Sequence, residues 1–202
     1  MLTIENLYFS YTGSAPWLLE NVDFHLAGGE YISIVGNNGS GKSTLLKIIL
    51  GFLKPVSGTV TRRARRIGYV PQRFAADASF PITVEEVIHS YGKLLHLKKI
   101  DVDQVLSVTG MEGYKKQLMG SPDLLILDEP STGVDLTSQR DIYKELDTLH
   151  KDKGVTILAV EHNLAEAGKV SDRLYHVEHG HGHLCSVRHY IEEYIEKEGG
   201  HV

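Results

Sequence analysis

The stretch Gly36-Asn37-Asn38-Gly39-Ser40-Gly41-Lys42-Ser43 decides how this chain folds. It matches in full the pattern of a phosphate-binding loop, in which four residues separate a glycine from Gly-Lys-Ser. Glycines let the backbone turn so that successive N–H groups point at an anion, and a helix that begins at the loop adds partial positive charge. We therefore predict that this loop, continued to Thr44, holds the phosphates of a nucleotide. Lys42 would reach the β- and γ-phosphates, and the Ser43 hydroxyl would ligate Mg²⁺.

The residues around the loop predict a parallel α/β sheet. The apolar run Tyr31–Val35 is typical of a buried parallel strand, and Lys42–Leu50 is predicted to be a helix that ends at Gly51. Further strands are predicted at 67–70, 124–127, 155–160 and 174–177, and helices at 83–117, 136–150 and 187–197. Strands that alternate with helices form parallel sheets. Alternating apolar residues in the first 35 positions predict additional strands with one buried face.

A second chemical motif is the sequence Leu124-Leu125-Ile126-Leu127-Asp128-Glu129, an apolar strand that ends in two carboxylates. Ligands of open α/β sheets bind at the carboxyl ends of the strands. Asp128 is therefore placed to hold Mg²⁺ through water, and Glu129 is placed to polarise a water for attack on the γ-phosphate. Alone, the pattern also fits a solvated acidic turn, but its pairing with the phosphate loop favours the catalytic interpretation.

Composition excludes several other classes of protein. The chain has 202 residues, enough for one domain with a small attached lobe, and 21 Lys and Arg against 26 Asp and Glu give a net charge of −5. No global basic field points to nucleic acid as a partner. The single cysteine excludes a disulfide framework. No apolar run is long enough to cross a bilayer, so we expect a soluble, cytoplasmic chain that acts on membranes only through a partner.

The order of the motifs along the chain resembles that of the ATP-binding subunits of ABC transporters. The matching segments are Phe9-Ser10-Tyr11, the phosphate loop, Tyr69-Val70-Pro71-Gln72, the strand to Pro130, residues 131–135 and Glu161-His162. This resemblance implies a P-loop NTPase (RecA-like) parallel sheet core with an N-terminal antiparallel β lobe and a shortened helical subdomain. It implies a single ATP-binding domain. The β lobe and core would occupy about 1–72, the helical subdomain about 73–120, the core continuation about 121–185 and a C-terminal helix about 187–198.

The resemblance also implies roles for four further residues. Tyr11 resembles the aromatic residue that stacks on adenine, and Gln72 the glutamine that senses Mg²⁺ and the attacking water. His162 resembles the histidine that contacts the γ-phosphate. Asp135 resembles the aspartate of a loop that crosses a dimer interface, although its position before Leu136 also fits a helix N-cap.

The family mechanism implies ATP and Mg²⁺ as ligands and a dimer of two such subunits bound to two membrane-spanning subunits at the cytoplasmic face of the membrane. The stretch Ile67-Gly68-Tyr69-Val70-Pro71-Gln72, followed by Phe80-Pro81-Ile82-Thr83-Val84, is similar to the branch that imports metal ions such as zinc or manganese. In that branch an extracytoplasmic metal-binding protein delivers the ion. Soluble family members without membrane partners are a further alternative.

One expected motif is missing. The Ser-Gly-Gly-Gln type signature of the family does not occur, and the chain passes from Gln117 directly to Leu118, where the signature and most of its helix would lie. Either the protein has a segment here that the printed sequence lacks, or the deletion is genuine and leaves a nucleotide-binding regulator or inactive subunit. The intact remaining motifs favour the first explanation.

Two further candidate sites are a cluster of histidines and a run of arginines. His179, His181 and His183 alternate with glycines near Cys185, which raises the idea of a zinc site; a solvated turn is the simpler interpretation. The run Thr61-Arg62-Arg63-Ala64-Arg65-Arg66 is predicted to be a solvated sheet edge that charge protects against aggregation.

Overall fold

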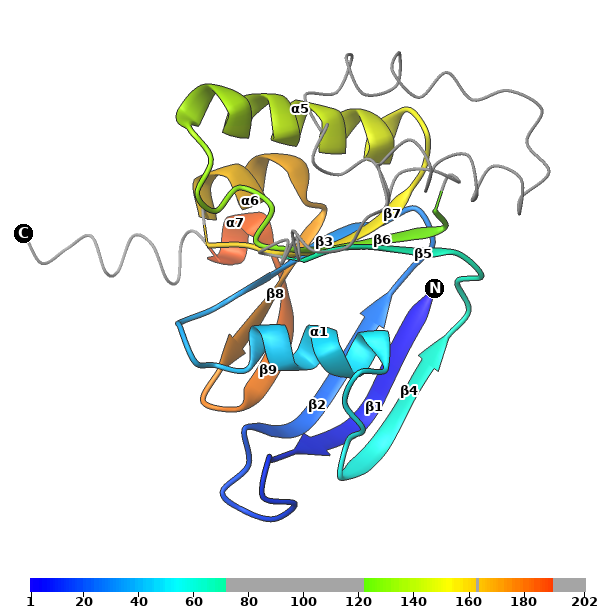
Figure 1. The fold of residues 1–202 in the computed structure, drawn as a ribbon, viewed down its shortest axis with the longest axis vertical. Helices are drawn as coiled ribbons and strands as arrows, with labels where there is room; N and C mark the ends of the chain where they lie inside the picture. The colour runs from blue at the N-terminus through cyan, green and yellow to red at the C-terminus, as the bar shows by residue number, and fades with distance from the viewer. Residues whose placement is uncertain (72–121, 163, 191–202) are drawn as a thin grey trace, which may run out of the picture.

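The computed structural model describes residues 1–71, 122–162 and 164–190 (Figure 1). Two sheets form the frame, one of three strands and one of six. Gln72, the predicted helix at 83–117 and the part of the predicted C-terminal helix beyond Tyr190 lie outside the described residues.

The six-stranded sheet has the order β5-β6-β7-β3-β8-β9. Its strands are β3 (Tyr31–Val35), β5 (Ile67–Val70), β6 (Leu124–Asp128), β7 (Thr156–Val160), β8 (Arg173–Glu178) and β9 (His181–Ser186). All neighbours pair in parallel except β9, which forms an antiparallel hairpin with β8. The predicted parallel sheet is therefore confirmed for five of the six strands, β5, β6, β7, β3 and β8, and the antiparallel β9 forms one edge.

The three-stranded sheet is antiparallel, with β1 (Leu2–Phe9) between β2 (Leu19–Leu26) and β4 (Ser57–Arg62). The predicted alternation holds, because Val22, Phe24 and Leu26 are buried while the residues between them are exposed. The edge strand β4 is almost entirely exposed and ends at Arg62. The basic run thus lies at the end of an edge strand, where charge discourages pairing with another chain.

The helices cover the six-stranded sheet from two sides. In Figure 1, α5 (Leu136–Lys151) and α6 (Leu164–Val170) lie on one side, and α1 (Lys42–Leu50) and the three-stranded sheet lie on the other. On the α1 side, apolar residues of both sheets and of α1 form one buried cluster. On the α5 side, residues such as Tyr143 and Leu146 pack on Leu125, Ile157 and Tyr31. A short helix, α7 (Val187–Tyr190), follows β9.

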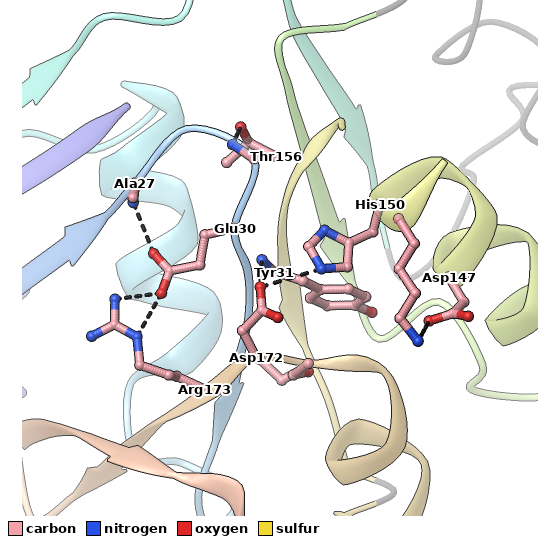
Figure 2. A network of polar contacts seen from close by, with 12 residues as sticks. Ala27, Glu30, Tyr31, Asp147, His150, Thr156, Asp172 and Arg173 are labelled. Carbon is pink, nitrogen blue, oxygen red and sulfur yellow. Dashed lines mark hydrogen bonds and ion pairs between the residues drawn. The ribbon is translucent and has the colours of Figure 1, made fainter. Parts of the chain in front are cut away.

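Polar contacts fix the amino end of β3 (Figure 2). The Glu30 carboxylate accepts the Ala27 N–H at 2.8 Å and the Arg173 Nε–H at 2.5 Å. The Tyr31 N–H donates to Asp172 Oδ2 at 2.9 Å, and His150 Nε2 lies 3.2 Å from the same oxygen. These contacts connect the strand to the start of β8 and to the end of α5. They therefore fix the position of β3 along its neighbouring strands.

Two further contacts join elements that are distant in the sequence. The Tyr175 hydroxyl of β8 donates to the carbonyl oxygen of Asp23 in β2 at 2.9 Å and so links the two sheets. Cys185 of β9 is buried, and its sulfur lies 3.6 Å from the Leu174 carbonyl oxygen. Among the helices of the described residues, none combines the length and the apolar character that a membrane span requires.

We expect Leu158→Ala in β7 to lower the free energy of unfolding by about 2–5 kcal/mol, because Leu158 is fully buried in the core under α1. The matched control is Leu136→Ala at the start of α5. Leu136 is 75% exposed, so this change should cost within about 0.5 kcal/mol. Urea unfolding followed by circular dichroism measures both, and equal losses would contradict the assignment of the core.

Candidate nucleotide-binding site

The phosphate loop joins the end of β3 to the start of α1, as its sequence predicts. Gly36 has φ 141°, and a Cβ atom there would lie 2.2 Å from the Val177 carbonyl oxygen of β8. Gly41 caps α1 with φ 102°. Both positions require glycine, because a side chain would clash with the neighbouring strand or strain the backbone. The loop is therefore pressed against the sheet, at the carboxyl ends of its strands.

Lys42 lies folded over the loop and is 5% exposed. Its Nζ donates to the carbonyl oxygens of Gly36 and Asn37, both at 2.8 Å. Burial lowers the pKa of Lys42, while the charges of Glu129 and Asp128 oppose this shift. The ammonium group is thus held between the loop and the acidic strand end, where it can meet phosphate oxygens.

Asp128 is the last residue of β6, and the hydroxyl of Ser43, in the first turn of α1, donates to its Oδ1 in a long hydrogen bond of 3.4 Å. Asp128 is 8% exposed. Burial raises the pKa of its carboxyl group, the Glu129 charge adds to the rise, and the Ser43 hydroxyl opposes it. A hydroxyl oxygen beside a carboxylate is the hard oxygen donor set that Mg²⁺ prefers, so these two residues fit that ion.

Glu129 and His162 form a direct contact, with Glu129 Oε1 2.6 Å from His162 Nε2. Thr132 Oγ1 donates to the other carboxylate oxygen at 3.1 Å, and the Glu129 N–H donates to the Val160 carbonyl oxygen at 3.0 Å. The backbone of Glu129 has φ 54°, a left-handed conformation that costs a non-glycine residue about 1–3 kcal/mol. The strain turns the carboxylate toward the histidine that follows β7.

A cavity of about 240 Å³ brings these groups together. It is lined by Leu18, Asn38, Gly39, Gly41, Lys42, Ser43, Thr44, Glu129 and His162. A second cavity of about 450 Å³ shares the loop residues Asn38 and Gly39 and is lined on its other side by Trp17, Leu18, Glu178, His179 and Gly180. The predicted phosphate-binding, acidic and histidine residues thus meet at one place.

Tyr11 and Asp135 lie outside the linings of these two cavities. Tyr11 is 67% exposed, and its hydroxyl lies 3.1 Å from Thr44 Oγ1. Asp135 accepts the Thr137 N–H on its Oδ1 at 3.0 Å, which is the geometry of an N-cap for α5. The adenine-stacking role of Tyr11 and the interface role of Asp135 stay predictions.

The zinc hypothesis for the histidine cluster needs correction. His179 lies in the β8–β9 turn with φ 49°, so it does not share a strand face with His181 and His183. His181 Nδ1 lies 3.1 Å from the Glu20 carbonyl oxygen, and the His183 ring contacts the buried His176 ring edge-on. Within residues 1–71, 122–162 and 164–190, no group of three or more His, Cys, Asp or Glu is placed to hold a metal ion.

Sequence reasoning missed a buried polar cluster behind the site. The side chains of Ser131, Tyr143 and Glu161 are all buried, and the Tyr143 hydroxyl lies 2.9 Å from Ser131 Oγ and 2.8 Å from Glu161 Oε2. Burial raises the pKa of Glu161 to about 8. The only sequence signal was a carboxylate at the end of an otherwise apolar strand.

Comparison with known proteins gives consistent results. A family model described as ABC transporter matches residues 19–132. A protein of Treponema pallidum (strain Nichols), named "probable metal transport system ATP-binding protein", is 42% identical over 96% of this chain and 89% of its own length. The "zinc import ATP-binding protein ZnuC" of Ruegeria sp. (strain TM1040) is 34% identical over 92% of this chain and 79% of its own.

A solved structure agrees in fold. The dimeric, post-hydrolysis state of the ATP-binding cassette MJ0796, bound to ADP and Pi, has a TM-score of 0.71 to this chain, over 93% of this chain and 99% of that one. Its sequence identity is 22%, so this likeness concerns the fold alone. The alignment with the Treponema protein extends over 212 positions, more than the 202 residues of this chain. That relative therefore has residues with no counterpart here.

We expect Glu161→Gln to remove a pH dependence of stability. In the folded chain Glu161 keeps its proton up to about pH 8, whereas the unfolded chain releases it near pH 4.5. Between these values the folded state binds more protons, so the free energy of unfolding falls as pH rises, by up to about 1.4 kcal/mol per pH unit. Urea unfolding from pH 5 to 8 should show the parent losing stability relative to Glu161→Gln. Parallel curves would mean that Glu161 is ionised in the fold.

Proposed function

Since the chain belongs to the ABC transporter family and is an ABC transporter ATPase, we propose that it drives the import of a divalent metal ion such as zinc or manganese. The observation that carries the catalytic part is the cavity in which Lys42, Ser43, Glu129 and His162 converge. The cargo assignment is supported by the relatives at 42% and 34% identity, whose names refer to metal transport and zinc import.

The residues of the cavity divide the work of phosphoryl transfer. Backbone N–H groups of the loop and the start of α1 bind the phosphates, and the Lys42 ammonium neutralises charge on the β- and γ-phosphates. Glu129 orients a water and accepts its proton, and the contact with His162 holds this carboxylate in place. Ser43, Asp128 and Gln72 would hold Mg²⁺, which would neutralise charge on the phosphates.

The proposed assembly is a homodimer attached to two membrane-spanning subunits on the cytoplasmic face of the membrane. An extracytoplasmic metal-binding protein would deliver the ion to those subunits. The exposed loop at Thr132, Gly133 and Asp135, next to Glu129, supports a surface through which one subunit reaches the other. Tyr11, exposed beside Thr44, is the proposed adenine contact at the open side of the loop.

The missing signature supports a second candidate, a nucleotide-binding regulator that does not turn over. The signature normally provides donors to the γ-phosphate across the dimer, and its loss would remove part of the charge stabilisation of the reaction. The intact mass of the purified protein separates the two. A mass of 22.5 kDa would favour the regulator, and a heavier chain with additional residues in the peptide that joins Gln117 to Leu118 would favour the ATPase.

We expect Glu129→Gln to lower kcat for ATP hydrolysis by roughly 10²–10⁴-fold while ATP still binds, because only the proton acceptor is lost. A phosphate-release assay measures turnover, and calorimetry measures binding. The control is Glu5→Gln, which makes the same change on the exposed face of β1 and should leave both values unchanged. Hydrolysis by Glu129→Gln at the parent rate would show that another group is the base.

The same pair of variants tests the cargo. In vesicles that contain the membrane-spanning partners, ATP should drive uptake of radioactive zinc or manganese with the parent and with Glu5→Gln. Glu129→Gln should reduce that uptake to the level without ATP. Hydrolysis without uptake of either ion would agree with the ATPase activity and contradict the proposed cargo.

A further inference from the structure

The buried cluster of Ser131, Tyr143 and Glu161 joins the two segments that carry the catalytic pair. Ser131 lies two residues after Glu129, and Glu161 directly precedes His162. Tyr143 reaches both from α5, at 2.9 Å from Ser131 Oγ and 2.8 Å from Glu161 Oε2. The three side chains are 8%, 3% and 1% exposed, so water does not compete for these contacts.

The phenol proton gives the cluster a direction. A tyrosine hydroxyl has one proton, so it donates to one neighbour and accepts from the other. Donation from Ser131 to Tyr143 and from Tyr143 to Glu161 Oε2 is the arrangement in which each of the two contacts has one proton. The Glu161 N–H donates to the Ile34 carbonyl oxygen at 3.0 Å, which attaches the same residue to β3. The cluster is therefore a continuous link from the loop after β6, through α5, to the end of β7.

We propose that this link sets the position of His162 relative to Glu129, so that Tyr143 and Glu161 are positioning residues for ATP hydrolysis. The proposal rests on the catalytic roles proposed above for Glu129 and His162. Neither Tyr143 nor Glu161 lines the cavity, and both act through the backbone segments that they hold.

The ionisation state of Glu161 determines at which pH the link is intact. The groups that act on it are Tyr143 on α5, Glu129 after β6 and Glu166 on α6, and it acts in turn on Tyr31 of β3. All of these groups become anionic when they ionise. Burial, together with the negative charges of Glu129 and Glu166, raises the pKa of Glu161 to about 8, while the hydrogen bond from Tyr143 opposes the rise. The carboxyl group of Glu161 is therefore neutral at pH 7. Loss of its proton places a negative charge close to Glu129 and disturbs the spacing that the link maintains.

The first experiment uses the ring resonances of His162 in the ¹³C-histidine-labelled chain, assigned with His162→Gln. Glu129→Ala provides the reference for a histidine without its partner. We expect Tyr143→Phe to move the His162 resonances at least halfway toward that reference, because the link is cut while the ring of residue 143 stays. Ser131→Ala should move them in the same direction, and it decides the matter if Tyr143→Phe does not fold.

Tyr175→Phe is the matched control. It removes another buried phenol hydrogen bond of 2.9 Å, on the opposite side of the sheet, and should leave the His162 resonances in place. If Tyr143→Phe leaves them in place as well, the cluster serves only stability and the proposal is wrong. This readout does not require hydrolysis, so it remains decisive if Glu129 is not the base.

The second experiment measures hydrolysis. We expect Tyr143→Phe to lower kcat about tenfold with KM for ATP within about twofold, while Tyr175→Phe keeps the parent kcat. In the parent, kcat should fall about tenfold from pH 7 to pH 9 as Glu161 ionises. In Glu161→Gln the ratio of the two rates should approach one, because an amide keeps the neutral form. A ratio equal to that of the parent would overturn the role of Glu161.

Discussion

The parallel pairing of β3 with β7 and β8, and of β6 with β7, is the constraint on which the site depends. Parallel neighbours end at the same edge of the sheet. Three groups that are far apart in the sequence therefore meet there: the phosphate loop after β3, Asp128 at the end of β6 and His162 after β7. Three of these strands, β3, β6 and β7, are buried over their whole length, as strands inside a parallel sheet usually are. The opposite end of β3 is held by Glu30, Arg173 and Asp172, which prevents the strand from sliding and moving its loop.

Local sequence patterns were sufficient to predict most of the elements in this arrangement. The helix Lys42–Leu50 was predicted with the bounds that the structure shows, because a glycine stands at each of its ends. The strand that leads to Asp128 was visible as an apolar run, and the loop glycines were visible as a pattern. In such segments the residue type alone specifies the backbone.

Features that depend on tertiary contact could not be predicted in the same way. Ser131, Tyr143 and Glu161 are separated by 12 and 18 positions, and nothing in the local sequence shows that a tyrosine of α5 reaches both of the others. His179, His181 and His183 had the spacing of one strand face, but Gly180 turns the chain and places His179 in the hairpin. The left-handed backbone of Glu129 was hidden for the same reason, because its hydrogen bond to Val160 on the neighbouring strand holds it there.

The buried position of Cys185 gives the chain a built-in reporter. It is the single cysteine, it lies on the edge strand β9, and its sulfur faces the Leu174 carbonyl oxygen of β8. A thiol reagent reaches a buried sulfur when a local opening of the native state exposes it, so the labelling rate of Cys185 reports openings around β9. The same hairpin carries His179 and Gly180 beside the phosphate loop. Openings of the hairpin beside the nucleotide site are therefore measurable on the unaltered chain, with no cysteine introduced.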